Sequence, residues 1–504
     1  TSKKMRDPIF LCEYCHAMGN GPGDVEKYVE LMYKYDYFFG GCIWEFCDHS
    51  VATGEYRYAT PNFIYGGDSG EGQHDSNFCV DGLVNPDRKL HTGMLEVKQA
   101  YRPVDFKFED GKLIATSRRY FTHLYDLDLY YTVERNGEVI DSGCLGTLDI
   151  APGKSKSFKF YSDVCDVTTL NVFARQNEET PWAPIGHEVA KAQFILSDKL
   201  PSKIEHVAAY AEETDEAIVV SYRESTVKIC KSCGLISSIV NNGKEMLSAP
   251  IRPTVWRAPT DNDRKIRRRW QAVGYDTAEL KCRSVSVSTE GVSVKVVANL
   301  TFVGNEEKEL MNIEISYLFG LLDGIKIKTR VTLSEGLPPL PRFGFNITMP
   351  EGAENVRYFG YGPTEAYEDK KLNARLGFFR TTATDNFVNY IKPQENGAHY
   401  GCRFADVSFH HGQGLYFSAD KFSLSVSHYS PKLLTNTAHA YELKPEKETT
   451  VIVDYRNAGI GSASCGPTLL PEYTISEREI EFTFNIKSVF APDVSPFDEF
   501  VGDN

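Results

Sequence analysis

The alternation of apolar and polar residues changes character after the first hundred positions of the chain. Residues 8–12 and 38–44 are short, continuous apolar runs, which are typical of strands buried on both faces of a parallel sheet. Between these runs, apolar residues recur at helical spacing over residues 25–32, and Asp24 stands at the position of an N-cap. A long Gly-rich stretch then leads to a second predicted helix at residues 94–101. This order of elements indicates βα units.

A sheet made of only these two strands could not be buried on both faces, which a parallel sheet requires. Residues 1–103 are therefore predicted to be the last two βα units of a (β/α)8 barrel, with the other six units upstream. The first residue is Thr1 rather than Met, and the segment after it does not resemble a signal peptide. We expect the chain to begin inside a longer protein, in which any targeting segment would lie upstream.

An all-β region is predicted after the barrel part, at residues 104–197. Apolar residues alternate with polar ones over residues 127–133, and Asn136-Gly137 marks a hairpin turn. The length of this region suits a small immunoglobulin-like β-sandwich. Residues 197–203 predict a linker to the rest of the chain.

A second all-β region is predicted at residues 208–491. It contains many short alternating segments, such as the two that flank Glu290-Gly291. This pattern predicts a large antiparallel β-sandwich, followed by a tail at residues 492–504. The fold class expected for the whole chain is thus multidomain, α/β plus all-β.

The composition excludes several classes of protein. Apolar residues make up 41% of the 504 residues, which is enough for packed cores and excludes general disorder. Lys and Arg number 55 against 69 Asp and Glu, so the net charge is −14, and nucleic acid and anionic membranes are not expected as partners. The basic run at residues 264–269 is accordingly predicted to be a solvated loop. No apolar run reaches the roughly 18 residues of a membrane span.

Twelve cysteines are too few for a disulfide scaffold in a chain of this length. The pairs Cys12/Cys15 and Cys230/Cys233 have Cys-x-x-Cys spacing, which leaves zinc binding or redox chemistry open. Reduced thiols are the favoured interpretation, because neither pair has a flanking histidine at ligand spacing. Reduced thiols indicate a cytoplasmic location, with the periplasm as an alternative.

Carboxylates stand where the two predicted barrel strands end. Glu13 follows the first apolar run, and Trp44 ends the second, with Glu45 and Asp48 just beyond it. Catalytic groups of β/α barrels lie at these strand ends. A carboxylate beside an aromatic ring is suited to cleaving a sugar, because the carboxylate attacks or stabilises an oxocarbenium-like centre while the ring packs on the sugar. A structural role for Glu13 as a hydrogen-bond acceptor stays open on this evidence.

Several motifs, in the same order along the chain, resemble those of the lac-type β-galactosidases of glycoside hydrolase family 2. They lie at residues 12–20, 40–48, 65–68, 77–83, 257–263, 359–363, 393–397 and 459–467. The resemblance extends over essentially the whole chain and includes the layout of a small middle domain and a large terminal one. It implies the C-terminal half of a retaining β-galactosidase that hydrolyses terminal β-D-galactosides such as lactose.

The resemblance also implies roles for individual residues. Glu13 matches the nucleophile, His16 matches a histidine that hydrogen-bonds sugar hydroxyls, and Trp44 matches the aromatic floor of the galactose pocket. Phe78 and Asp81 match the loop that holds Na⁺ or K⁺ beside the galactose 6-hydroxyl, Phe78 through its backbone carbonyl. The best-known relatives carry Asn in place of Asp81, which leaves the cation preference open.

Cys465 falls in a loop of the terminal domain that reaches the active site in this family. Some relatives place a Trp at this position, where it stacks on the leaving sugar. A thiol offers no such surface, so a substrate-binding role for Cys465 and the specificity for the leaving group both stay open.

Two parts of the family's active site have no counterpart in this sequence. The general acid/base is a Glu at the end of barrel strand four, and both this residue and the Mg²⁺ ligands are expected upstream of Thr1. Glu45 and Asp48 do not match the acid and are expected to hydrogen-bond within their own loop. The isolated fragment is therefore expected to be inactive. Its expected partners are the galactoside substrate, the missing N-terminal half and further copies in a homo-oligomer.

Two other functions stay open on the sequence. The chain could be a non-catalytic carbohydrate-binding or assembly module of two β-sandwiches, or part of another family 2 glycosidase such as a β-glucuronidase. Glu13 and His16 argue against a pure scaffold, and the segment at residues 393–397 favours the galactosidase branch. Six further βα units encoded upstream, with an Asn-Glu strand end, would decide between these possibilities.

Overall fold

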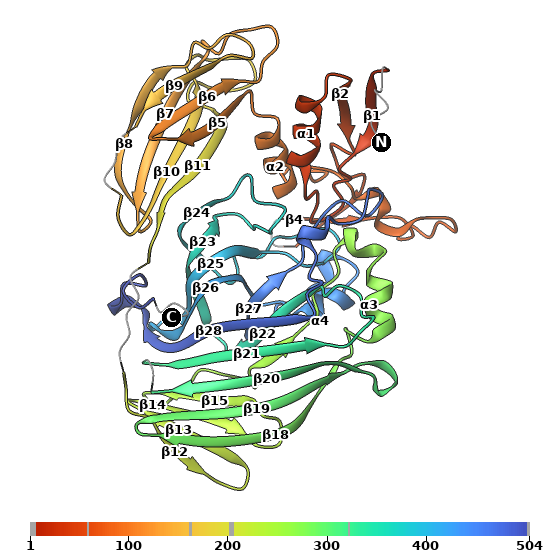
Figure 1. Ribbon diagram of the computed structural model, residues 1–504. Coiled ribbons are helices and arrows are strands. Elements are labelled where there is room, and N and C mark those ends of the chain that lie inside the picture. Colours follow the sequence, from red (N-terminus) through yellow and green to blue (C-terminus); the bar gives the residue numbers. More distant parts are fainter. Residues whose placement is uncertain (1–6, 58–59, 161–163, 201–205, 321–322, 501–504) are drawn as a thin grey trace.

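The computed structural model describes residues 7–57, 60–160, 164–200, 206–320 and 323–500. In Figure 1 the N-terminal part (red) and the β-sandwich (orange to yellow) lie beside one another above the terminal β-domain (green to blue). Among the described residues, no helix combines the length and the apolar character that crossing a membrane requires.

The N-terminal part contains a parallel pair of strands with two helices, and all four predicted elements are confirmed. They are β1 (Ile9–Tyr14), α1 (Val25–Lys34), β2 (Phe38–Ile43) and α2 (Thr92–Ala100). The strands pair in parallel, with Leu11 opposite Gly41. Phe10 is 48% exposed and Phe39 is 65% exposed, so this two-stranded sheet is not buried on both faces.

One local prediction in this part is confirmed only in position, and another is wrong. Asp24 occupies the N-cap position, but its side chain caps no helical N–H group. Its carboxyl is partly buried near Asp369 and Glu472, and burial followed by these two carboxylates raises its pKa to about 7. The Gly-rich stretch, predicted as a loop, contains a hairpin of β3 (Val51–Arg57) and β4 (Thr60–Ile64). Gly54 and Pro61 are poor strand formers and interrupt the alternation that would have marked it.

The middle of the chain forms the predicted two-sheet sandwich. One sheet has the order β5-β6-β9 and the other β11-β10-β7-β8. Their bounds are β5 Val104–Glu109, β6 Lys112–Ser117, β7 Leu127–Arg135, β8 Glu138–Thr147, β9 Ser155–Lys159, β10 Val167–Gln176 and β11 Glu188–Asp198. Asn136 and Gly137 form the two-residue hairpin turn with φ values of 50° and 78°, which confirms that prediction. The predicted linker begins inside β11, and its residues 201–203 lie outside the described residues.

The terminal domain confirms the predicted large antiparallel β-sandwich. Its smaller sheet contains β12 Tyr210–Glu213, β13 Ala217–Tyr222, β14 Ser225–Cys230, β15 Ile236–Asn241 and β16 Lys244–Glu245. Its twelve-stranded sheet contains β17 Arg252–Thr254, β18 Glu279–Glu290, β19 Ser293–Val303, β20 Glu309–Phe319, β21 Ile325–Leu333, β22 Arg342–Met349, β23 Ala353–Gly362, β24 Arg375–Thr382, β25 Ala398–Phe409, β26 Gln413–Ser427, β27 Thr449–Asn457 and β28 Glu479–Phe490. A shared apolar core joins the sheets, with Ile218 and Val227 from the smaller one and Val296 and Ile313 from the larger.

Short helical segments connect these strands. They are α3 Arg267–Val273, α4 Pro431–Asn436 and the 3-10 turns η1 Ser76–Cys79, η2 Asp261–Arg264, η3 Asn305–Glu307, η4 Ala440–Glu442, η5 Pro471–Tyr473 and η6 Ala491–Asp493. The basic run predicted as a loop continues into α3, because Trp270 is buried and its indole N–H donates to the Pro339 carbonyl at 2.7 Å. Residues 492–500 of the predicted tail are packed, with Phe497 and Phe500 buried.

Candidate active site

Glu13 lies at the end of β1, where its side chain is 47% exposed. Its Oε2 is 3.3 Å from Nε2 of the buried His16, which follows on the loop after the strand. The two strand ends are joined by backbone hydrogen bonds, from Trp44 N to the Tyr14 carbonyl at 3.1 Å and from Ala17 N to the Trp44 carbonyl at 2.8 Å. The predicted carboxylate, histidine and indole therefore come from adjacent strand ends.

Trp44 is oriented by Asp81. The indole Nε1 donates to Asp81 Oδ2 at 2.8 Å, and the tryptophan remains 43% exposed. Asp81 itself is 3% exposed, and its backbone carbonyl accepts a hydrogen bond from Glu45 N at 2.8 Å. This pairing fixes the indole edge while leaving part of the ring accessible to a ligand.

The Asp81 carboxyl is in an unfavourable environment for a lone negative charge. Burial first, and then the adjoining Glu45 carboxyl, raise its pKa to about 7. A cation held here would compensate that charge, so the residues present fit a monovalent ion. Phe78 lies nearby in η1, with the Arg264 guanidinium 4.7 Å from its ring centroid. Among the described residues, no three His, Cys, Asp or Glu side chains converge as a metal site.

Glu45 and Asp48 make contacts within the loop that follows β2 and with its neighbours. Asp48 Oδ1 accepts a hydrogen bond from Gly82 N at 2.7 Å, and its Oδ2 is 3.4 Å from Nε2 of His91. Burial raises the pKa of Asp48 to about 8 and lowers that of His91 to about 4. Glu45 Oε1 is 3.4 Å from Nδ1 of His49.

Cys465 lies close to the mouth of the candidate site, which is formed by Glu13, His16, Trp44 and Asp81. It is more than 450 positions from Glu13 in sequence. The pKa of its thiol is raised, first by burial and then by the Glu13 carboxylate, with Asp81 adding to the effect. Lys265 and Arg264 act in the opposite direction. Gly23 N, on the loop after β1, donates to the Gly461 carbonyl at 2.8 Å, so the terminal-domain loop that carries Cys465 contacts the loop that follows Glu13.

Asn20, Asp261 and Gln394 support the mouth, and sequence analysis assigned them no role. Asn20 N and Asp261 N each donate to Gln394 Oε1 at 3.1 Å. Asp261 Oδ1 also accepts from Asn77 Nδ2 at 2.7 Å, which ties the Phe78 loop to the terminal domain. Gly19 adopts a φ of 52°, and a Cβ there would lie 2.2 Å from the Gln394 side chain, so a larger residue would strain the backbone and displace Gln394. Their motifs at residues 257–263 and 393–397 were the available signal.

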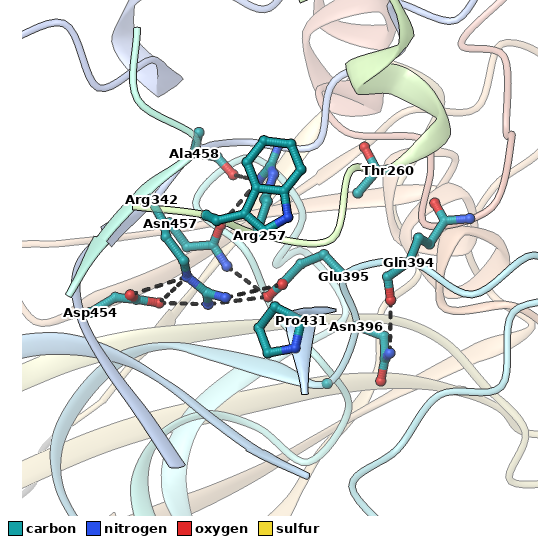
Figure 2. Close-up of polar contacts among 12 residues, drawn as sticks. Arg257, Thr260, Arg342, Gln394, Glu395, Asn396, Pro431, Asp454, Asn457 and Ala458 are labelled. Atoms are coloured by element: carbon teal, nitrogen blue, oxygen red, sulfur yellow. Dashed lines mark hydrogen bonds and ion pairs between the residues drawn. The ribbon is translucent and has the colours of Figure 1, made fainter. Parts of the chain in front are cut away.

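A buried network of charged side chains adjoins Gln394 through the next residue, Glu395 (Figure 2). Arg342 is fully buried, and its Nη2 donates to Asp454 Oδ2 at 2.7 Å while its Nη1 donates to Glu395 Oε2 at 3.2 Å. Asn457 Nδ2 donates to Glu395 Oε1 at 2.9 Å. Arg257 is held beside it by Asp263, with 2.8 Å between Nη2 and Oδ1. The segment at residues 393–397 is thus anchored through Glu395.

Replacing Arg342 with methionine should destabilise the terminal domain by about 3–5 kcal/mol, because Glu395 and Asp454 would be left as uncompensated buried charges. Burial already raises the pKa of Asp454 to about 7, so protonation should relieve part of the loss, and the deficit should be smaller in mild acid than in alkali. Urea unfolding followed by circular dichroism measures this. Arg330→Met is the control, because its ion pair with Glu481 is exposed and should contribute about 0–1 kcal/mol. Equal effects of the two substitutions would contradict the prediction.

A cavity of about 450 Å³ lies between the N-terminal part and the terminal domain, lined among others by Phe63, His91 and Tyr390. Glu13 is not among its lining residues. The Glu13 side chain is 47% exposed and Trp44 is 43% exposed, so this part of the chain leaves both accessible.

Comparisons with known proteins agree with this organisation. The family described as "Beta galactosidase small chain" matches residues 221–486, "Glycosyl hydrolases family 2, TIM barrel domain" matches residues 1–106, and "Beta-galactosidase, domain 4" matches residues 113–197. The order of these three matches is the order of the three parts of the structure.

Curated relatives of this chain are named beta-galactosidases. The beta-galactosidase of Actinobacillus pleuropneumoniae is 35% identical over 490 residues, covering 95% of this chain and 48% of the relative. That of Staphylococcus xylosus is 32% identical, covering 96% and 49%, and that of Kluyveromyces lactis is 30% identical, covering 96% and 47%. The chain spans about half the length of the curated relatives it matches. Together with the family matches, these similarities establish that the chain belongs to the lac-type β-galactosidases of glycoside hydrolase family 2 and corresponds to their C-terminal half.

Proposed function

We propose that this chain supplies the nucleophile of a retaining β-galactosidase that hydrolyses terminal β-D-galactosides such as lactose. The observation that supports the proposal is the grouping of Glu13, His16 and Trp44 at two adjacent strand ends, with Asp81 hydrogen-bonded to the Trp44 indole. A half-exposed carboxylate beside a buried imidazole and an accessible indole has the groups that a glycosidase needs on one side of the scissile bond.

In this proposal the Glu13 carboxylate attacks the anomeric carbon and forms a covalent glycosyl-enzyme, which water then hydrolyses. His16 Nε2 lies 3.3 Å from Glu13 Oε2, where it can hydrogen-bond the carboxylate or, once the sugar is bound, a sugar hydroxyl. Trp44 packs on the apolar face of the galactose, with its orientation set by Asp81. A retaining enzyme needs a second carboxyl about 5–5.5 Å from the first to protonate the leaving oxygen, and we assign it to the part of the enzyme that would precede this chain.

On the leaving-group side, the proposed site has no aromatic ring at position 465 that could stack on a sugar. Cys465 lies near Glu13 and presents a small thiol rather than a ring. We therefore expect broad tolerance of the leaving group and little gain in affinity from a second sugar.

The test of the proposal is to trap the covalent intermediate in the full-length enzyme. A 2-deoxy-2-fluoro galactoside with an activated leaving group should label one carboxylate, because the fluorine slows both steps while the activated leaving group restores only the first. Peptide mass mapping should place the label on Glu13, and Glu13→Gln should take up none. Labelling of Glu45, Asp48 or any other carboxylate would refute the assignment.

We further propose that Asp81 and the Phe78 carbonyl hold Na⁺ or K⁺ in the complete enzyme. When bound, the ion would offset the paired negative charge of Asp81 and Glu45 and offer a ligand position to the sugar's 6-hydroxyl. Mg²⁺ is also proposed for the complete enzyme, with ligands in the preceding part.

Replacing Asp81 with alanine should raise the Na⁺ or K⁺ concentration that gives half-maximal activity of the full-length enzyme by at least about tenfold, because the proposed site loses its carboxylate ligand. Activity titrations at constant ionic strength measure this shift. Asp87→Ala is the control, because Asp87 is exposed on the same stretch of chain and pairs with Lys89. An unchanged response to both ions in Asp81→Ala would rule out the cation role.

The proposed partners are the preceding half of the same enzyme, the galactoside and further copies of the chain in a homo-oligomer. All twelve cysteines are free thiols in the structure, which favours a cytoplasmic location for the enzyme.

A further inference from the structure

The two Cys-x-x-Cys pairs of the chain have different backbone conformations. Cys12 lies in β1 and Cys15 just beyond its end. A strand advances about 3.3 Å per residue, so three residues span about 10 Å, whereas a disulfide requires a Cα separation of roughly 4.4–6.8 Å. Cys15 is also 1% exposed, and burial raises the pKa of its thiol well above the usual range. This pair is therefore unsuited to forming a disulfide.

The pair Cys230/Cys233 instead spans the end of β14 and the turn that leads to β15. Gly234 N donates to the Cys230 carbonyl at 2.8 Å, and Cys230 N donates to the Leu235 carbonyl at 2.9 Å. These bonds fold the turn back on itself, which brings residues three apart to a Cα separation below roughly 7 Å. The side chains of Cys230 and Cys233 interact directly, and both are partly exposed.

The two thiols of this turn are chemically unequal. Cys230 Sγ is 3.1 Å from the Ser232 hydroxyl, and this hydrogen bond, aided by the backbone N–H groups of Ser232 and Cys233, lowers the pKa of Cys230. Burial raises the pKa of Cys233 to about 11. In thiol–disulfide exchange the thiol that is more readily ionised attacks first, and the partner then resolves the intermediate.

We propose that Cys230 and Cys233 form a thiol–disulfide exchange site for small disulfides of the glutathione class. The Cys230 thiolate attacks one sulfur of the small disulfide, forming a mixed disulfide and releasing one thiol. Cys233 then loses its proton, attacks Cys230 Sγ and releases the second thiol. Two protein thiols become one disulfide while one small disulfide becomes two small thiols, so electrons and protons balance.

A third thiol can compete in this exchange. Cys282 in β18 is partly exposed, its Sγ is 3.9 Å from the Lys231 carbonyl, and it influences the ionisation of Cys233. Its thiol has a raised pKa through burial. It is a slower resolving partner than Cys233, which is three residues from Cys230 in the same turn.

The experiment incubates the full-length enzyme, in which β1 has its neighbouring strands, with oxidised glutathione, quenches with acid, alkylates the free thiols and maps peptides by mass. We expect a Cys230–Cys233 disulfide and no Cys12–Cys15 disulfide. In the double variant Cys233→Ser/Cys282→Ser, a glutathione adduct should accumulate at Cys230. In Cys230→Ser/Cys282→Ser, the adduct at Cys233 should form at least about tenfold more slowly, because far less of its thiol is ionised.

The exposed Cys144 in β8 serves as an internal reference in every sample. Stable adducts at Cys230 in the wild-type chain, without the internal disulfide, would overturn the proposal. Equal adduct rates at Cys230 and Cys233 in the two double variants would also overturn it. Circular dichroism of each variant checks that the fold is retained, and none of the substituted residues belongs to the proposed catalytic site.

Discussion

Replacing Glu13 with glutamine should lower kcat of the full-length enzyme on a nitrophenyl galactoside by roughly 10⁴- to 10⁶-fold, with substrate binding largely retained. Glutamine preserves the size of the side chain and can still contact His16 Nε2, but its amide cannot attack the anomeric carbon. The loss should therefore fall on kcat rather than KM. Steady-state kinetics on purified protein measure both constants.

Two further variants make this prediction sharper. Glu13→Asp keeps the carboxylate but shortens the side chain by one methylene, and a displacement of this size should cost on the order of 10²-fold. Glu30→Gln, on the exposed face of α1, is the matched control and should leave the rate unchanged. A Glu13→Gln enzyme with more than a few per cent of wild-type kcat would exclude Glu13 as the nucleophile.

Residues 1–504 expressed alone should not hydrolyse galactosides at a measurable rate, and activity should appear only when the preceding half is supplied. Loss of a general acid alone is typically worth 10²–10⁴-fold. In addition, Phe10 and Phe39 are exposed on the two barrel strands, and Glu13 is half-exposed beside them. Without neighbouring strands these residues cannot position the carboxylate against a bound sugar.

The measurement is a nitrophenyl galactoside assay of the purified chain with and without the separately expressed upstream half. The two β-domains should still fold, because each has its own apolar core. The isolated chain should therefore give a β-rich circular dichroism spectrum, while limited proteolysis should cut first within the N-terminal hundred residues. Full activity of the chain alone would mean that a second catalytic carboxylate lies within it, with Glu45 and Asp48 as the first candidates.

Much of the fold is predictable from short stretches of sequence. The apolar runs of β1 and β2 and the helical spacing of α1 depend on residues that are close together in the chain. The Asn136-Gly137 turn is equally local, because both residues adopt positive φ. The β3–β4 hairpin was not predicted, because Gly54 and Pro61 interrupt its alternating pattern. Helix α3 was not predicted either, because its run of basic residues indicated a loop, whereas the buried Trp270 stabilises a helix.

The candidate site likewise contains some residues that local sequence identifies and others that only the folded chain brings together. Glu13 and Trp44 could be identified before the structure, because adjacent parallel strands bring their C-terminal ends together, whereas His16 was assigned through the family resemblance. Asn20 and Gln394 could not be paired in advance, since 374 positions separate them. No local periodicity encodes a contact of that kind.

The sequence by itself determined the order of βα units and β-domains, the strand-end placement of Glu13 and Trp44, and the family to which the motifs belong. These features follow from neighbouring residues. Only the tertiary structure decided that Asp81 shares its environment with Glu45, that Gln394 joins Asn20 to Asp261, and that the chain folds back between Cys230 and Cys233. Ionisation and reactivity depend on burial and on charges a few ångströms away, and the folded chain brings those charges from distant positions.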